Sequence, residues 1–203
     1  LMTFLFTMVL SLVVSVDFTN SLFYFLRFSE FLVVYFLIVG DVVKLEKLLL
    51  CFIAAMSVAS LIGILQYVFQ SSLGLKFLGE PLINSAMTGV AKFHVLGSDL
   101  LRSYGTFPHP NLFGAYLVLA ILFSVSFVRK EIFSKKALFL AIGLCSLALV
   151  FTFSRGAFLA LFIGLMASFF ISKTKFPRNT SLIVSSLLIL LLLIRPAVDQ
   201  GLQ

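Results

Sequence analysis

Apolar residues occur in long runs along this chain, and short polar or charged links separate the runs. About 20 apolar residues suffice for a helix to cross the ~30 Å hydrocarbon core of a bilayer. The runs are continuous, whereas the strands of a transmembrane barrel alternate apolar and polar positions. The pattern therefore predicts an all-α, polytopic helical membrane protein. Seven transmembrane helices are predicted, at about 1–16, 21–39, 48–70, 111–128, 137–153, 157–171 and 180–194.

The connection from 71 to 110 is too apolar for a free loop, so we expect it to lie against the helical bundle. Within it, residues 90–104 alternate loosely between apolar and polar types around Gly97, Ser98 and Asp99. Alternation interrupted by turn-forming residues favours a short β-hairpin. An interfacial helix over 82–96 is the alternative interpretation.

The composition agrees with a membrane protein. Hydrophobic residues make up 61% of the chain and charged residues 11%, against about 25% charged residues in ordinary soluble domains. The formal net charge of +7 is better explained by basic cytoplasmic links than by nucleic-acid binding. We expect the lipid bilayer as a partner and no nucleic acid. Cys51 and Cys145 both lie within apolar runs, which favours two small core residues over a disulfide or a metal site.

The Lys and Arg residues of the links fall unevenly on the two sides of the predicted bundle. Nine lie in the links after the second, fourth and sixth helices, and five lie on the other side. Because cytoplasmic loops carry the excess of basic residues, the N-terminus is predicted inside and the C-terminal end outside. We expect one transmembrane domain over 1–203. Since both chain ends adjoin apolar runs, we expect a fragment of a longer protein.

The chemistry is densest between 101 and 116, which reads L-R-S-Y-G-T-F-P-H-P-N-L-F-G-A-Y. Arg102 there, and Arg155 in the Ser-Arg-Gly break, each precede a helix that starts on the outer side. A helix N-terminus attracts anions, and an Arg fork binds phosphate oxygens in pairs. The two arginines together predict an outward-facing phosphate or diphosphate site. The structural alternative is that they reach lipid headgroups, or that Arg155 caps the tight turn.

His109 and Asn111 flank Pro110 at the start of the predicted fourth helix. Asn is a common N-cap and Pro a common first helical residue, so a structural role is expected for Asn111 and Pro110. His109 is a candidate acid, base or hydrogen-bonding group, although a histidine between prolines is more often structural. No spacing typical of metal ligands and no cofactor motif occurs in the sequence, so no metal and no cofactor are predicted.

Arg27 and Glu30 lie inside the predicted second helix, three positions apart and thus on one face. Charges within a membrane helix are costly and usually pair or face a wet cavity. A structural ion pair is the favoured interpretation. A role in a substrate cavity is the alternative.

Residues 101–114, with R-x-Y-G-T-F-P-H-P-N-x-x-G, resemble the signature of the O-antigen ligase and O-antigen polymerase superfamily of bacterial envelope proteins. The stretch F-T-F-S-R-G-A at 151–157 is similar to the same superfamily's S-R-G motif between two later helices. The resemblance covers roughly 48–196. It implies a GT-C-like, metal-independent glycosyltransferase without cofactors, in the bacterial cytoplasmic membrane.

The resemblance also implies a substrate and roles for single residues. The enzyme would move a glycan from undecaprenyl diphosphate to a hydroxyl of an acceptor glycan or lipid at the outer membrane face, as in lipopolysaccharide and other polysaccharide biosynthesis. Arg102 and Arg155 would hold the diphosphate, with Asn111 beside them. The general base, usually a His of a large external loop, would lie beyond Gln203. A polymerase of the same superfamily, a transporter or flippase of lipid-linked sugars, and a structural subunit are the alternatives.

Overall fold

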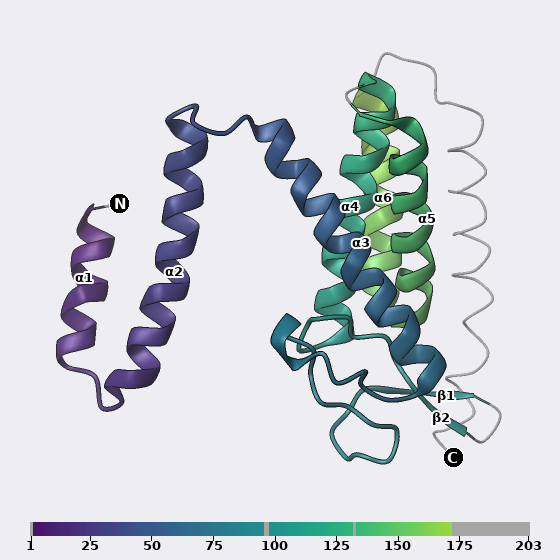
Figure 1. Ribbon diagram of the computed structural model, residues 1–203, viewed down its shortest axis with the longest axis horizontal. Coiled ribbons are helices and arrows are strands. Elements are labelled where there is room, and N and C mark those ends of the chain that lie inside the picture. Colours follow the sequence, from purple (N-terminus) through teal and green to yellow (C-terminus); the bar gives the residue numbers. More distant parts are fainter. Residues whose placement is uncertain (1, 96–97, 132, 172–203) are drawn as a thin grey trace. The chain divides into compact units, whose positions relative to one another are not determined.

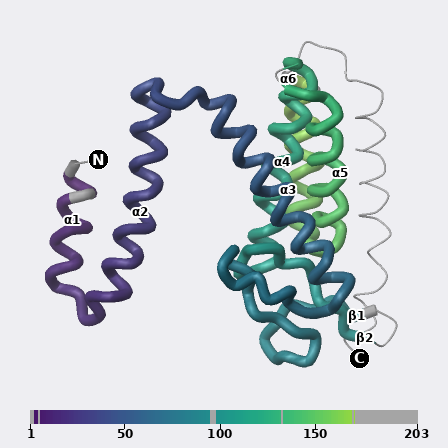
Figure 2. Tube along the Cα trace, in the orientation of Figure 1, coloured from purple at the N-terminus to yellow at the C-terminus, as the bar shows by residue number. Residues whose placement is uncertain are grey.

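The computed structural model describes residues 2–95, 98–131 and 133–171 (Figures 1 and 2). Contacts divide the chain into two compact units, 1–50 and 51–203, with the boundary inside the third helix. We describe each unit by itself.

The first unit is a helical hairpin of α1 (Met2–Val13) and α2 (Phe18–Val39). The turn between the helices ends at Asp17, whose carboxylate accepts a hydrogen bond from the Asn20 amide at 3.1 Å and thereby caps α2. The rings of Phe4 and Phe28 lie 5.1 Å apart and join the two helices. Most other large apolar side chains of α2 are exposed, as expected for a helix in contact with lipid.

The second unit is a bundle of α3 (Leu45–Phe69), α4 (Pro110–Lys130), α5 (Lys135–Thr152) and α6 (Arg155–Ile171). Helix α4 packs against both α5 and α6 (Figure 1). Its fully buried Phe113, Leu117 and Ile121 form the centre of the apolar core, together with Leu149 of α5 and Leu161 of α6. The short links make α4, α5 and α6 alternate in direction, so the start of α4, the end of α5 and the start of α6 meet at one end of the bundle.

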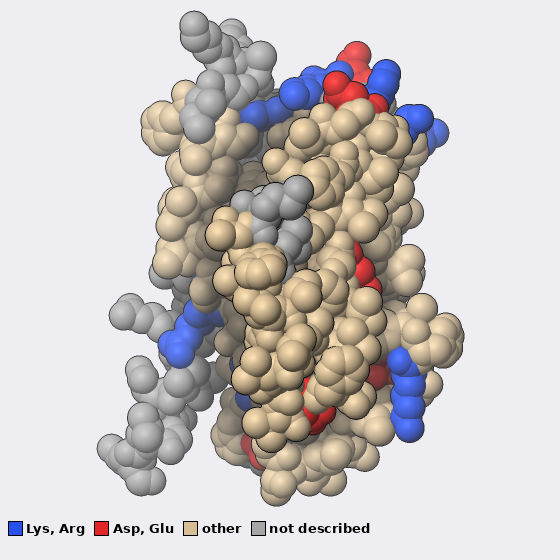
Figure 3. Space-filling model, turned by 90° about the vertical axis from the view of Figure 1, so that its left-hand side faces the viewer, with Lys and Arg blue, Asp and Glu red and all other residues tan. Residues whose placement is uncertain are grey.

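Four of the described helices, α2, α3, α4 and α5, are long and apolar enough to cross a membrane. The prediction of a multi-pass helical membrane protein is therefore supported. Helices α1 and α6 are present where the first and sixth spans were predicted, but have 12 and 17 residues. The predicted span at 180–194 lies outside the described residues. Uncharged side chains cover most of the face shown in Figure 3, which suits a lipid environment.

The connection between α3 and α4 folds against the end of the bundle where α4 begins (Figures 1 and 2). It contains a short 3-10 helix, η1 (Lys76–Leu78), and the strands β1 (Lys92–Val95) and β2 (Ser98–Leu101). The strands are antiparallel, with Lys92 opposite Leu101 and Val95 opposite Ser98. The predicted hairpin is thus confirmed. The alternative helix over 82–96 is wrong, because Gly89 takes a left-handed φ of 79° and β1 follows directly.

Candidate functional site

Arg102 follows β2 and joins three parts of the bundle. Its Nε donates to the carbonyl of Thr152 at the end of α5, at 2.6 Å. One terminal nitrogen donates to Oδ1 of Asn111 in the first turn of α4, at 2.7 Å. The side chain is half-buried. The hairpin, the end of α5 and the start of α4 are therefore connected through a single guanidinium group.

The Arg102 contact stabilises the end of α5. The last carbonyls of a helix lack partners within the helix and carry the negative end of its dipole. Thr152 offers one of these carbonyls to Arg102, and Phe151 offers another to the Ser103 amide at 2.9 Å. Burial lowers the pKa of the Arg102 guanidinium, yet an arginine keeps its charge in proteins. The group is thus a fixed cation with further N–H donors left for a ligand.

Arg155 begins α6 directly after a tight break. Helix α5 ends at Thr152, and its C-cap is Phe153, a non-glycine residue with a left-handed φ of 48°. The Ser154 hydroxyl then accepts a hydrogen bond from the Ala157 amide at 3.4 Å, in the position of an N-cap for α6. A tight break is present as predicted, but it consists of Phe153 and Ser154, because Arg155 and Gly156 already belong to the first turn of α6. The Arg155 side chain is exposed and is left to interact with groups outside the bundle.

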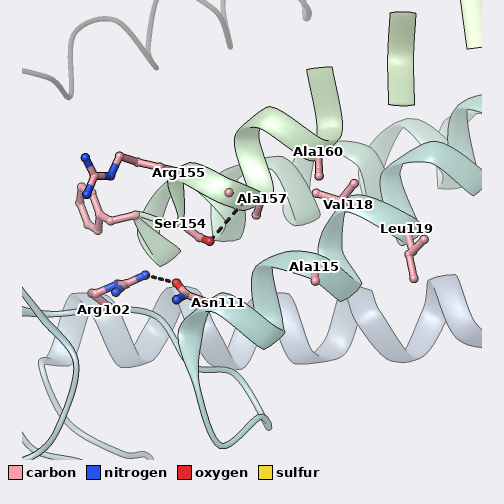
Figure 4. A pocket seen from close by; sticks show the side chains of 11 residues that line it. Arg102, Asn111, Ala115, Val118, Leu119, Ser154, Arg155, Ala157 and Ala160 are labelled. Atoms are coloured by element: carbon pink, nitrogen blue, oxygen red, sulfur yellow. Dashed lines mark hydrogen bonds between the residues drawn. The ribbon is translucent and has the colours of Figure 1, made fainter. Parts of the chain in front are cut away.

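The two arginines line one open cleft between α4 and α6, with a volume of about 630 Å³. Figure 4 shows Arg102 and Arg155 at the same end of this cleft, with Asn111 beside Arg102. The other end is lined by small and apolar side chains of the two helices. The lining residues are Arg102, Asn111, Ala115, Val118, Leu119, Phe153, Ser154, Arg155, Gly156, Ala157 and Ala160. The cleft thus has a cationic mouth and an apolar interior.

Gly114 allows α4 to approach the break between α5 and α6. A Cβ on this residue would lie 2.9 Å from the Cβ of Ala157 and 3.3 Å from that of Ser154. Both distances are shorter than ordinary contacts between carbon atoms. The same Cβ would lie 3.4 Å from Oγ1 of Thr152, so α4 also comes close to the end of α5 at this position.

The structure corrects the predicted cap of α4. The N-cap is His109, with extended backbone, and its Nδ1 accepts a hydrogen bond from the Asn111 amide at 3.2 Å. Asn111 is wrong as the cap, because it lies in the first turn and its side chain turns to Arg102 instead. Pro110 occupies the first helical position as predicted. His109 is exposed and does not line the cleft.

Arg27 and Glu30 form the predicted ion pair on α2, with 3.5 Å between the terminal nitrogen and the carboxylate oxygen. The Arg27 guanidinium also lies 5.2 Å from the centre of the Phe23 ring. Both side chains are largely exposed within the first unit. Their role in a cavity stays a prediction.

Three polar residues that the hydropathy pattern does not single out organise the outer connection: Gln66, Gln70 and Glu80. Gln66 is fully buried at the end of α3 and bonds to Glu80 and to the backbone of Gly105. Gln70, one helical turn later, accepts a hydrogen bond from the Leu101 amide at 2.6 Å. The sequence does contain a signal for Gln66 and Gln70, since two amide side chains lie four positions apart at the end of an apolar run. A polar residue in a membrane helix needs a partner, so this spacing indicates hydrogen bonds to another segment.

No protein-family model, no curated protein and no solved structure matches this chain. Among the described residues, no three His, Cys, Asp or Glu side chains lie close enough together to hold a metal ion. The chemistry of the cleft and the two sequence motifs that line its mouth are the observations that bear on function.

Proposed function

We propose that this chain is part of an O-antigen-ligase-like glycosyltransferase of the GT-C type, with seven transmembrane helices, in a bacterial cytoplasmic membrane. It binds a glycan linked to undecaprenyl diphosphate and transfers the glycan to a hydroxyl group of an acceptor glycan or lipid at the outer face. The observation that carries the proposal is the meeting of Arg102 and Arg155, one from each resembling motif, at the mouth of one cleft.

The cationic mouth suits a diphosphate for two reasons. Two guanidinium groups can each bind phosphate oxygens in pairs while keeping their charge. In addition, α4 and α6 both begin at this end of the bundle, and the positive end of each helix dipole favours an anion there. Asn111 belongs to the mouth as well, although its Oδ1 is already occupied by Arg102.

The apolar interior of the cleft supports a lipid-linked substrate. Ala115 and Val118 of α4 face Ala157 and Ala160 of α6 across it (Figure 4). Helix α4 is long and apolar enough to cross a membrane. A molecule with a charged headgroup and a hydrocarbon chain would match the change from guanidinium to alanine along the cleft.

The negative charge that develops during transfer is on the leaving diphosphate, which the two arginines would hold. The bond between the anomeric carbon and the diphosphate oxygen breaks, while the acceptor oxygen forms a new bond to that carbon. The diphosphate leaves with the electron pair, and fixed cations stabilise the negative charge that develops on it. The acceptor proton passes to a base, which the family resemblance assigns to a histidine of an external loop.

Replacement of the arginines tests the proposal. Arg102→Ala or Arg155→Ala in the membrane-embedded protein should lower glycan transfer by a factor of about 10² or more, the usual effect of removing a preorganised charge partner. Arg102→Lys and Arg155→Lys keep the charge but lose the paired geometry, so both should retain only part of the activity. Lys130→Ala, at the far end of α4, is the charge control. Normal transfer by both alanine variants would end the proposal.

An activity assay distinguishes glycan transfer from transport of the lipid-linked glycan. Purified protein is mixed with lipid-linked glycan and acceptor, and product formation is compared with movement of the lipid-linked glycan between leaflets of a vesicle. Product formation supports the glycosyltransferase, whereas movement without product favours a transporter or flippase. An acceptor that carries the same repeating sugar would identify a polymerase.

A further inference from the structure

The backbone that carries Arg102 is held at every amide from 101 to 105. The Leu101 amide donates to Oε1 of Gln70, and the amides of Tyr104 and Gly105 donate to Oε1 of Gln66. Between them, Arg102 donates to the Ala91 carbonyl at 3.3 Å and Ser103 to the Phe151 carbonyl at 2.9 Å. Five successive amides therefore find partners in other parts of the bundle.

Gln66 uses its whole amide group for this purpose. Its Oε1 accepts from Tyr104 at 3.2 Å and from Gly105 at 2.8 Å. Its Nε2 donates to the Gly105 carbonyl and to Oε1 of Glu80, both at 2.9 Å. Glu80 in turn accepts from the Leu73 and Leu75 amides at 2.6 Å. One fully buried side chain thus fixes the turn after Arg102 and the start of the outer connection.

The segment is also held by close packing. A Cβ on Gly63 of α3 would lie 2.4 Å from Oγ of Ser103 and 2.8 Å from the Phe113 ring. Gly105 has a left-handed φ of 59°, and a Cβ there would lie 2.8 Å from the Phe113 ring and 3.0 Å from the Ala59 carbonyl. Two glycines therefore let residues 103–105 enter the space between α3 and α4.

We propose that Gln66 and Gln70, which we name the glutamine clamp, are positioning residues for the anion site. They bind neither substrate nor reacting atoms, and they act through the 101–105 backbone to hold the Arg102 guanidinium between Thr152 and Asn111 at the mouth of the cleft. The clamp deepens the proposed function and relies on it only for the ligand-binding test below.

A first experiment observes Arg102 without any ligand. In full-chain protein labelled with ¹⁵N-arginine in detergent micelles, the Nε–H of Arg102 should exchange slowly with solvent, and Arg102→Lys assigns its signal. Gln66→Met keeps the volume and unbranched shape but removes all four bonds of the amide group, and Gln70→Met removes the Leu101 contact. Each should speed exchange of the Arg102 Nε–H and of the Arg102 backbone amide by about tenfold or more, because local opening becomes easier.

Ser124→Ala is the matched control, because Ser124 is equally buried but bonds only to the Ala120 carbonyl of its own helix. It should leave the exchange of Arg102 unchanged. Far-ultraviolet circular dichroism should show the same helix content for all variants, so that a loss of protection is separated from unfolding. Unchanged Arg102 exchange in both folded methionine variants would overturn the clamp.

A second experiment measures the affinity for farnesyl diphosphate, a short-chain lipid diphosphate, in a double-mutant cycle. Gln66→Met should weaken binding in the parent chain and in Arg155→Lys, but should add little in Arg102→Lys, because both changes then act through the same group. Equal additional losses in both arginine backgrounds would contradict the clamp. Absence of farnesyl diphosphate binding by the parent chain would count against the proposed function, and the exchange experiment would still decide on the clamp.

Discussion

The contacts of His109 assign a different role to each of its ring nitrogens. Nδ1 accepts from the Asn111 amide and must be unprotonated in this contact, which leaves Nε2 for the proton of the neutral ring. The ring also meets Tyr104 edge-on at 6.4 Å between centroids. These contacts describe a residue that starts α4 and thereby sets the position of Asn111.

Two substitutions of His109 separate capping from proton transfer. His109→Asn keeps a side chain that can cap a helix, whereas His109→Ala loses the cap and about 1 kcal/mol of stability. We expect His109→Asn to melt near the parent temperature and to retain glycan transfer, and His109→Ala to melt lower. Thermal unfolding and transfer assays provide the measurements. Equal loss of transfer in both variants, with stability kept in His109→Asn, would instead assign proton transfer to this histidine.

The small size of Gly114 determines how closely α4 approaches the break between α5 and α6. Gly114→Ala should push α4 away from the break at 154–157, because the new Cβ would lie 2.9 Å from that of Ala157. Such overpacking costs about 1–3 kcal/mol. Asn111 of α4 and Thr152 of α5 both accept hydrogen bonds from Arg102. A shift of α4 should therefore disturb Arg102 and lower the affinity for diphosphate as well. Thermal unfolding and farnesyl diphosphate binding measure the two effects.

Gly143→Ala in α5 is the matched control for Gly114→Ala. It adds the same methyl group to a helix of the same bundle, and no atom lies within 4 Å of the new Cβ. Its melting temperature should equal that of the parent or exceed it, since alanine favours helix by about 1 kcal/mol over glycine. Equal destabilisation by both changes would show that contact at 114 is not the cause.

At the scale of elements, the outer connection depends on a carboxylate. Burial raises the pKa of Glu80, but the hydrogen bonds from Gln66, Leu73 and Leu75 together lower it below its usual value. A carboxylate with a lowered folded pKa contributes stability that is complete above its unfolded pKa, about 4.3. The contribution is lost as the pH falls through the folded pKa.

We therefore expect protection of the outer connection to be constant above about pH 5 and to decrease below about pH 4. Glu80→Gln should lower stability at pH 7 by about 2 kcal/mol, because three hydrogen bonds to a charged acceptor are weakened. In Glu80→Gln, the protection of the outer connection should also decrease less below about pH 4 than in the parent chain. Hydrogen exchange of 71–105 at several pH values measures both. An equal acid decrease in parent and variant would assign the effect to other groups, such as Asp99, whose pKa is lowered chiefly by its hydrogen bond with His94.

The helices could be predicted well from the sequence, and the contacts at the cleft mouth could not. The bounds of α2 to α6 differ by only a few residues from the predicted spans, because lipid requires long apolar runs that end at polar links. Arg102 and Thr152 are 50 residues apart in sequence, and their contact depends on how the hairpin folds onto α5. Gln66 could not be recognised from the hydropathy pattern, because one polar residue hardly changes the mean hydropathy of a 25-residue helix.

At the scale of the whole molecule, the two ends of the second unit differ in chemistry. The arginine mouth and the outer connection lie where α4 and α6 begin. At the opposite end, the last residues of α4 (Arg129 and Lys130) and the first of α5 (Lys135 and Lys136) form a basic cluster on the two sides of a short link. A basic cluster in a short link is typical of the cytoplasmic side. If that holds here, the cleft mouth opens outward.

Cysteine labelling tests this orientation. Single cysteines are introduced as Ala86→Cys in the outer connection and Ser134→Cys in the basic link, in a chain with Cys51 and Cys145 replaced by alanine. A membrane-impermeant maleimide added to intact cells should label Ala86→Cys and should reach Ser134→Cys only after permeabilisation, because the two positions lie at opposite ends of membrane-crossing helices. The reverse pattern would place both arginines on the cytoplasmic side. A site there could not receive a glycan at the outer face, so the proposed reaction depends on this result as much as on the arginines themselves.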